Sequence, residues 1–420
     1  MLNTREDIQQ HSQRPHFLYV QIGIAFLAFL LIGANDGAFG VILPGIAAHY
    51  HMNKANISLL FLFNSAGYLI AALNTGFLMT RLGARAFLLL GLGLFAVSTG
   101  LLVLMPPFLL VLALFIPIGF GIAVLDAGLN SYIAGLPRNS VVLNYLHACY
   151  GGGALLGPLL ATLILALSLG WNIVYLVWAV VGIAIFFAVF VAFKQALAAT
   201  RQGEVSEGQG QVQNETGKRH SAQSVLRSIL TMRVFWLVAL FLFLYSGNEH
   251  SVGNWSYSFL TEQRHTSALF AGWIVSGYWM GLTLGRMMLA WVSRRIGEYR
   301  LVALCLLGAL SSALLIWLVP VQFISIVGLF LLGFSFGPIF PTTIALTSQL
   351  VPHQSLSSAI GLITSFTSVG VAFLPWVLGN LAQLLNLNVL PPYVLAVVLI
   401  MCAFWLVLRA RVRNRGHVVA

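Results

Sequence analysis

Long apolar runs recur along the whole chain and alternate with short polar segments, a pattern typical of a protein that crosses a membrane many times. A helix that spans a bilayer needs about 20 predominantly apolar residues, and twelve such runs are present. The predicted spans are 17–46, 57–79, 86–105, 107–135, 142–168, 171–193, 233–260, 268–293, 300–319, 321–350, 355–384 and 391–410. The predicted fold class is therefore an all-α membrane protein with twelve transmembrane helices.

A hydrophilic stretch divides the predicted spans into two groups of six. It contains Gly208-Gln-Gly-Gln-Val-Gln213 and charges of both signs, a composition that cannot bury a core. We predict a six-helix bundle in residues 1–193, a linker in 194–232 with a short amphipathic piece near Val225, and a second six-helix bundle in 233–420.

The two halves are weakly similar, and the similarity falls on unusual residues. An acid follows asparagine at Asn35-Asp36 in the first span and at Asn248-Glu249 in the seventh, with glycine four residues after each acid. The loops after spans 2 and 8 share Arg81-Leu-Gly83 and Arg295-Ile-Gly297. Repeats in parallel orientation are one architecture of secondary transporters, in which the substrate site lies between the halves near the membrane midplane.

Composition and charge agree with this organisation. The chain is 59% apolar and only 7% charged, whereas soluble domains are roughly 25% charged, so soluble enzyme folds are excluded. The net charge of +11 is spread unevenly, because one set of alternate loops carries nearly all the basic residues and the other carries only Lys54 and Arg264. By the positive-inside rule both termini and the linker are predicted to be cytoplasmic, in an inner or plasma membrane. This distribution is a topology signal and does not indicate nucleic acid binding.

The sequence contains no motif for enzymatic chemistry. The cysteines and histidines lack metal-ligand spacing, and there is no phosphate-binding loop and no Gly-x-Ser-x-Gly elbow. We therefore expect no enzyme activity, no cofactor and no metal site. The expected partners are a small solute, protons and the lipid bilayer, and we expect a monomer.

Asp126 is the strongest candidate for function. It is the only charged residue between Arg85 and Arg138 and lies near the middle of an apolar run. A charge at the centre of a spanning helix costs about 2.5–3.5 kcal/mol on insertion scales, so such residues face a bundle interior or a water-filled cavity. Asn130 lies one turn further and shares this face. The pattern predicts that Asp126 takes up and releases a proton; the alternative is a structural hydrogen bond to a neighbouring helix.

Three further charged residues lie well inside predicted spans. Asp36 and Glu249 are also candidates for proton coupling, although each lies in a glycine-interrupted stretch and could instead stabilise a helix bend. Arg286 is about eight residues, or roughly 12 Å, from the basic end of its helix. An internal carboxylate partner, Glu249 or Asp126, is therefore predicted; the alternative is contact with carbonyls or lipid phosphate.

Amide and aromatic residues on spans 4, 5 and 7 are candidate substrate contacts. Amides and carboxylates match hydroxyl groups, and aromatic rings stack on the C–H faces of a polyol. Asn144 and His147 share one face of span 5, where His147 could instead be a packing residue, and the aromatic residues of span 7 could belong to an interfacial belt. The predicted substrate-binding residues are Asn130, Asn144, His147, Tyr150, Asn248, Asn254 and Trp255.

Five motifs together carry a family resemblance. They are Gly33-Ala-Asn-Asp36, Asp126-Ala-Gly-Leu-Asn130, Leu143-Asn144-Tyr-Leu-His147, Tyr245-Ser-Gly-Asn-Glu249 and Gly281-Leu-Thr-Leu-Gly285-Arg286. With them the chain resembles the major facilitator superfamily over its full length and, within it, the branch of the fucose:proton symporter and the glucose/galactose permeases. The resemblance implies that Asp36 and Asp126 act in sugar binding and proton coupling. The chain departs from that branch in span 4, where Asp126 and Asn130-Ser131 stand in place of Glu and Asn-Pro.

These patterns predict a secondary active transporter that takes up a sugar-like, small polar solute with protons by alternating access. One alternative is a proton-linked exporter of amphipathic compounds, because Gly153-x-x-x-Gly157-Pro158 partly resembles the span 5 motif of drug antiporters. Another is a membrane receptor or scaffold that transports nothing, against which the mostly short loops argue.

Overall fold

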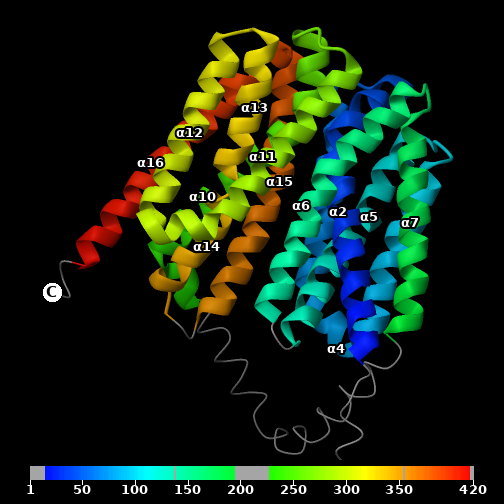
Figure 1. Ribbon diagram of the computed structural model, residues 1–420, viewed down its shortest axis with the longest axis horizontal. Helices are drawn as coiled ribbons and strands as arrows, with labels where there is room; N and C mark the ends of the chain where they lie inside the picture. Colours follow the sequence, from blue (N-terminus) through cyan, green and yellow to red (C-terminus); the bar gives the residue numbers. More distant parts are fainter. Residues whose placement is uncertain (1–14, 137–138, 194–226, 353–354, 417–420) are drawn as a thin grey trace, which may run out of the picture.

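The computed structural model describes residues 15–136, 139–193, 227–352 and 355–416, which form long helices that run between the two ends of the molecule (Figure 1). The first half contains α2 (Pro15–His49), α3 (Lys54–Ile57), α4 (Leu59–Leu102), α5 (Phe108–Ala134), α6 (Asn139–Ala166) and α7 (Trp171–Ala192). The second half contains α10 (Arg233–Gln263), α11 (Ala268–Ile296), α12 (Glu298–Leu318), α13 (Gln322–Phe336), α14 (Ile339–Leu350), α15 (Leu356–Leu385) and α16 (Leu390–Gly416), with a 3-10 turn at Leu387–Val389. Helices of this length satisfy most of their backbone polar groups internally, as a lipid environment requires.

The described helices provide twelve crossings, which confirms the predicted number. Ten segments are long and apolar enough to cross a membrane. One of them, Lys54–Leu102, holds two crossings because α4 turns at Gly83, and α10 adds a further crossing, since polar residues around Glu249 interrupt its apolar run. The tenth crossing is broken into α13 and α14. The amphipathic piece predicted near Val225 lies outside the described residues.

Both halves pack their helices in the same pairs. In the first half α2 packs against α6 and α4 against α5, and in the second half α10 packs against α15 and α11 against α13. Gly83 and Gly297, the glycines of the two matching tripeptides, have φ angles of 75° and 78° and ψ angles of 158° and 154°. Glycine adopts this region without steric penalty. The weak similarity between the halves therefore extends to the backbone.

Close glycine contacts hold α2 against α6. A β-carbon on Gly33 would overlap the carbonyl oxygen of Tyr150, and one on Gly153 would overlap that of Leu30. Such contacts let two helix backbones approach closely, which is how membrane helices gain packing energy.

Substituting Gly33 with alanine is expected to destabilise the protein by about 2 kcal/mol, because the added methyl group has to push two backbones apart. Thermal unfolding of the detergent-solubilised protein measures the effect. Gly23→Ala is the matched control on the same helix, since nothing lies within 4 Å of a β-carbon at Gly23. Equal unfolding temperatures for the two variants would contradict the proposed overlap.

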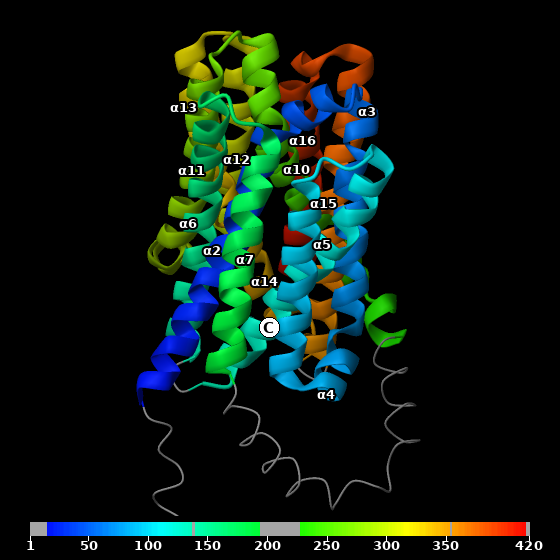
Figure 2. The same ribbon diagram turned by 90° about the vertical axis from the view of Figure 1, so that its right-hand side faces the viewer.

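The two halves meet closely at one end of the molecule, the end at which α3 lies beside α15, here called the Lys54 end (Figure 2). Lys54 Nζ forms an ion pair with Glu262 Oε2 at 2.8 Å, and the Lys54 backbone N–H donates to Gln383 Oε1 at 2.9 Å. Nearby, a β-carbon on Gly40 would lie 2.6 Å from the carbonyl oxygen of Gly253. Direct contacts of α2, α3 and α4 with α10 and α15 close this end.

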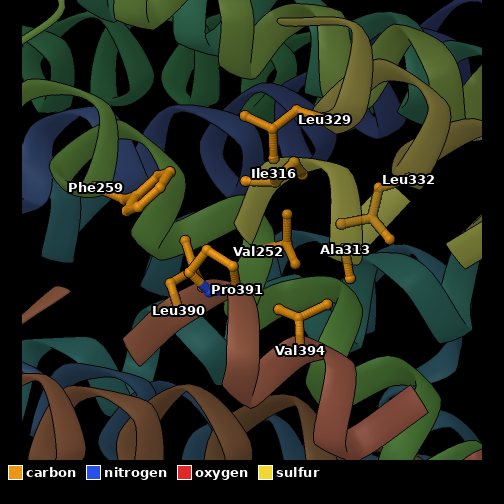
Figure 3. A pocket seen from close by; sticks show the side chains of 9 residues that line it. All are labelled: Val252, Phe259, Ala313, Ile316, Leu329, Leu332, Leu390, Pro391 and Val394. Atoms are coloured by element: carbon orange, nitrogen blue, oxygen red, sulfur yellow. The ribbon is translucent and has the colours of Figure 1, made fainter. Parts of the chain in front are cut away.

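A small apolar hollow lies inside the second half, between α10, α12, α13 and α16 (Figure 3). Its volume is about 10 Å³, and residues such as Val252, Ala313 and Leu329 line it. That volume is at the lower limit for one water molecule, and the lining offers no polar group that could orient a solute. The hollow is therefore a packing gap and not a solute site.

Candidate functional site

Asp126 on α5 is held by two hydrogen-bond donors. Tyr68 Oη on α4 donates to Asp126 Oδ2 at 2.8 Å, and Asn130 Nδ2 donates to Asp126 Oδ1 at 2.8 Å. Hydrogen bonds to a carboxylate are shorter and stronger than those between neutral groups. His147 on α6 is close enough for its charge to interact with that of Asp126. The carboxyl group is thus fixed in orientation, with a titratable imidazole within electrostatic reach.

Tyr68 was not among the residues predicted from the sequence. A tyrosine inside an apolar span is unremarkable, and nothing in the order of residues connects position 68 with position 126. Only the packing of α4 against α5 brings its hydroxyl group to the acid.

Asp36 on α2 forms a second acidic centre, where three helices meet. Tyr150 Oη on α6 donates to Asp36 Oδ2 at 3.0 Å, and Asn35 Nδ2 donates to Asp36 Oδ1 at 3.3 Å. Asp36 also lies within electrostatic range of His250 on α10 and of Asp126. Asp36 therefore connects the first half electrostatically with the second.

Glu249 and Arg286 form an ion pair within the second half. Arg286 Nη2 lies 3.3 Å from Glu249 Oε1, and the Glu249 side chain is 6% exposed whereas the Arg286 side chain is 35% exposed. Tyr278 Oη donates to the backbone oxygen of Glu249 at 2.9 Å. Glu249 was one of the two acids predicted as the partner of Arg286, and the pair connects α10 with α11.

These charged groups lie within electrostatic range of one another and come from both halves. The charge of His147 interacts with Asp126 of the first half and with Arg286 of the second, while its side chain is exposed. Asn144, one turn away on the same face of α6, is exposed as well. Further along that face a β-carbon on Gly151 would lie 2.7 Å from Thr283 Oγ1 on α11. The polar face of α6 is therefore directed at the second half.

Three residues predicted to bind substrate lie elsewhere. Asn248 is fully buried, and its Nδ2 is 3.4 Å from the backbone oxygen of Val394 on α16. Trp255 is 1% exposed and donates through Nε1 to the backbone oxygen of Pro375 at 3.0 Å, and Asn254 is 7% exposed where the backbone of α10 meets α2. Asn254 and Trp255 therefore belong to the contact at the Lys54 end, and Asn248 to packing inside the second half.

The site offers carboxylate, amide, imidazole and phenol groups in one place. This set can hold the hydroxyl groups of a solute through several hydrogen bonds and can bind or release protons. Among the described residues, no three histidine, cysteine or acidic side chains come together as metal ligands would.

Replacing Tyr68 with phenylalanine is expected to destabilise the protein by about 1.5 kcal/mol, because one hydrogen bond to Asp126 is lost while the ring still packs. Thermal unfolding of the detergent-solubilised protein measures this. Tyr145→Phe is the matched control, since Tyr145 is 61% exposed on α6. An unchanged unfolding temperature in the Tyr68 variant would show that this hydroxyl group does not hold Asp126.

Comparison with known proteins identifies the family. Residues 25–256 and 250–418 both match the family described as the Major Facilitator Superfamily. The chain belongs to the major facilitator superfamily. Among its relatives, Bypass of stop codon protein 6 of Saccharomyces cerevisiae is 26% identical over 397 residues, which cover 89% of this chain and 79% of that protein. The glucose/mannose transporter GlcP of Bacillus subtilis is 24% identical over 376 residues, which cover 85% of this chain and 86% of that protein.

The fold comparison agrees with the sequence comparison. The crystal structure of a D-xylose-proton symporter resembles this major facilitator chain with a TM-score of 0.72, covering 93% of this chain and 97% of that one at 13% identity. At that identity the likeness concerns the fold alone. These comparisons confirm the predicted family and the predicted twelve-helix major facilitator fold. They also confirm the prediction that the protein is a carrier and not an enzyme.

Proposed function

We propose that this major facilitator protein takes up a sugar-like, small polar solute together with protons, by alternating access. The observation that carries the proposal is the environment of Asp126, an acid in the middle of a membrane-spanning helix that two donors orient and that lies beside His147. An acid is retained at such depth when it has a function there. Proton binding by Asp126, with Asp36 and Glu249 as further acids of the same space, would couple the solute to the proton gradient.

The solute is proposed to bind where the polar face of α6 meets the acids. Asn130, Asn144, His147 and Tyr150 supply amide, imidazole and phenol groups suited to hydroxyl groups. The relative GlcP is a glucose/mannose transporter, and this name supports a sugar-like solute. Asn254 and Trp255 would reach the solute only after the Lys54 end has opened.

The proposed cycle moves residues 1–193 and 233–420 as two units joined by a cytoplasmic linker at 194–232. We propose that both termini are cytoplasmic, as the distribution of basic residues among the loops predicts, so that the closed Lys54 end faces outward. The ion pair between Lys54 and Glu262 has to break for outward opening. Proton release from Asp126 to the inside would then reset the carrier.

The arrangement of Gly153 and Gly157 does not favour the exporter alternative. β-Carbons at these positions would overlap the carbonyl oxygens of Leu30 and Ala34 on α2. Close packing between α2 and α6 thus accounts for the pair of glycines without a role in drug export.

Solute-induced alkalinisation of the medium around proteoliposomes tests the proposal. Hexoses, deoxyhexoses and polyols are added one at a time to vesicles with a weakly buffered exterior. We expect alkalinisation with a narrow set of sugars, because each solute molecule enters with a proton. The absence of a signal with every sugar, together with dye efflux driven by an inward proton gradient, would overturn uptake in favour of the exporter.

A further inference from the structure

Two matching glycines bring the halves into contact. Gly40 follows Asp36 by four residues on α2, and Gly253 holds the corresponding place on α10. A β-carbon on Gly40 would lie 2.6 Å from the backbone oxygen of Gly253, so the two backbones touch here. Both helices run toward the Lys54 end, because α2 leads into α3 and α10 ends one residue after Glu262 of the Lys54 ion pair. The contact between the two glycines therefore belongs to the closed end.

His250 on α10 and Asp36 on α2 both lie one turn before this contact. His250 is three residues before Gly253, and Asp36 is four residues before Gly40. Residues three or four apart share one face of a helix, so each side chain lies on the face of its touching glycine. The two side chains are within electrostatic range of each other, and both are half-buried. An acid of the first half and a titratable base of the second thus face each other across the interface.

The surroundings of His250 determine which ring nitrogen exchanges a proton. Nδ1 lies 2.9 Å from the backbone oxygen of Ser246. A carbonyl oxygen can only accept, so Nδ1 carries a hydrogen, and the proton that changes the charge of the ring binds at Nε2. Trp279 of α11 packs edge-on against the ring, with the ring centroids 6.3 Å apart. The ring is thus held on its own half while its charge can change.

The other groups around Asp36 are neutral donors and one like charge. Tyr150 Oη on α6 donates to Oδ2, and Asn35 Nδ2 donates to Oδ1. Asp126 on α5 is also within electrostatic range and carries the same sign of charge when ionised. Of these groups and His250, only the imidazole can supply a positive charge to the Asp36 carboxylate.

We propose that protonated His250 attracts the Asp36 carboxylate across the two halves and keeps the Lys54 end closed until the proton leaves. The attraction exists only while His250 carries its second proton and Asp36 carries none. When Nε2 releases that proton to water, the contact between Gly40 and Gly253 loses one of the interactions that maintain it. The inference rests on the proposed alternating access, in which it makes proton release a condition for opening the Lys54 end.

Hydrogen–deuterium exchange at the Lys54 backbone amide tests the proposal without solute or proton gradient. Lys54 is the first residue of α3, so its N–H has no partner within the helix and donates to Gln383 Oε1 of the second half. At pH 6 we expect this amide to exchange about fivefold faster in His250→Gln, since a partly exposed charge pair contributes about that factor. His49→Gln, an exposed histidine at the end of α2, is the matched control and should exchange as the wild-type protein does. Equal rates in the wild-type protein and His250→Gln would overturn the proposal.

A second variant separates the charge of His250 from its shape. His250→Lys keeps a cation, so exchange at Lys54 should stay slow at both pH 6 and pH 8. In the wild-type protein it should become faster at pH 8, relative to the intrinsic rate of the amide, as the imidazolium loses its proton. Amides of α12, which packs against helices of the second half, report whether each variant is folded.

Fast exchange in both folded variants would assign His250 to packing and overturn the charge pair. The same holds for wild-type protection that does not change between the two pH values. The expected exchange pattern without any sugar-driven alkalinisation would instead support the charge pair and reject the proposed solute.

Discussion

Replacing Asp126 with asparagine is expected to abolish accumulation of the solute while exchange across the membrane continues. Asparagine keeps the size of the side chain and can still pair with Tyr68 and Asn130, so the site should remain assembled. It cannot bind and release a proton. In the proposed cycle, net uptake against a gradient needs this step every time, whereas the exchange of internal for external solute needs no net proton movement.

The experiment compares two assays on the same vesicles, with a sugar identified by the alkalinisation screen. One assay follows accumulation driven by an imposed proton gradient, and the other follows counterflow without a gradient. We expect the concentration ratio across the membrane to fall to about one in Asp126→Asn, with counterflow retained. Glu298→Gln is the control, an acid-to-amide change at a helix end away from the central site. Accumulation of solute above the external concentration by Asp126→Asn would rule out the coupling role.

The course of the chain was largely predictable from hydropathy, because each crossing has to supply a continuous apolar run. The two departures both arise at glycine or proline. Gly83 lets the second and third crossings join in one bent helix, and Gly337-Pro338 interrupts the tenth. Hydropathy averages over about a turn or more and cannot detect a backbone change at one residue.

The candidate site was predictable only in part. The energetic cost of a charge in a membrane singles out Asp126 and Arg286 from the sequence alone. Tyr68 could not be predicted because its hydrogen bond to Asp126 depends on how α4 packs against α5. Trp255 was predicted to contact the solute because it lies in the same span as Glu249. The structure places it at the end where the two halves meet, and that position depends on contacts between distant helices. Positions on one helix can be assigned from spacing, whereas contacts between helices require the assembled fold.

Loss of Arg286 is expected to destabilise the protein far more than loss of both members of its ion pair. In Arg286→Met the Glu249 side chain, which is 6% exposed, is left without its cationic partner. Breaking a buried pair from one side costs about 3 kcal/mol or more. Glu249→Gln should cost less, because the Arg286 side chain is 35% exposed and water can solvate the remaining charge.

The double variant Glu249→Gln with Arg286→Met decides whether the two residues act as a pair. It leaves no unpaired charge, so it should unfold closer to the wild-type protein than Arg286→Met does, in thermal unfolding of the detergent-solubilised protein. Additive destabilisation in the double variant would mean that Arg286 acts through other groups, such as His147 or Tyr150, with which its charge also interacts. A strong coupling would instead assign the pair to holding α10 against α11, on the side of the proposed solute space opposite Asp126.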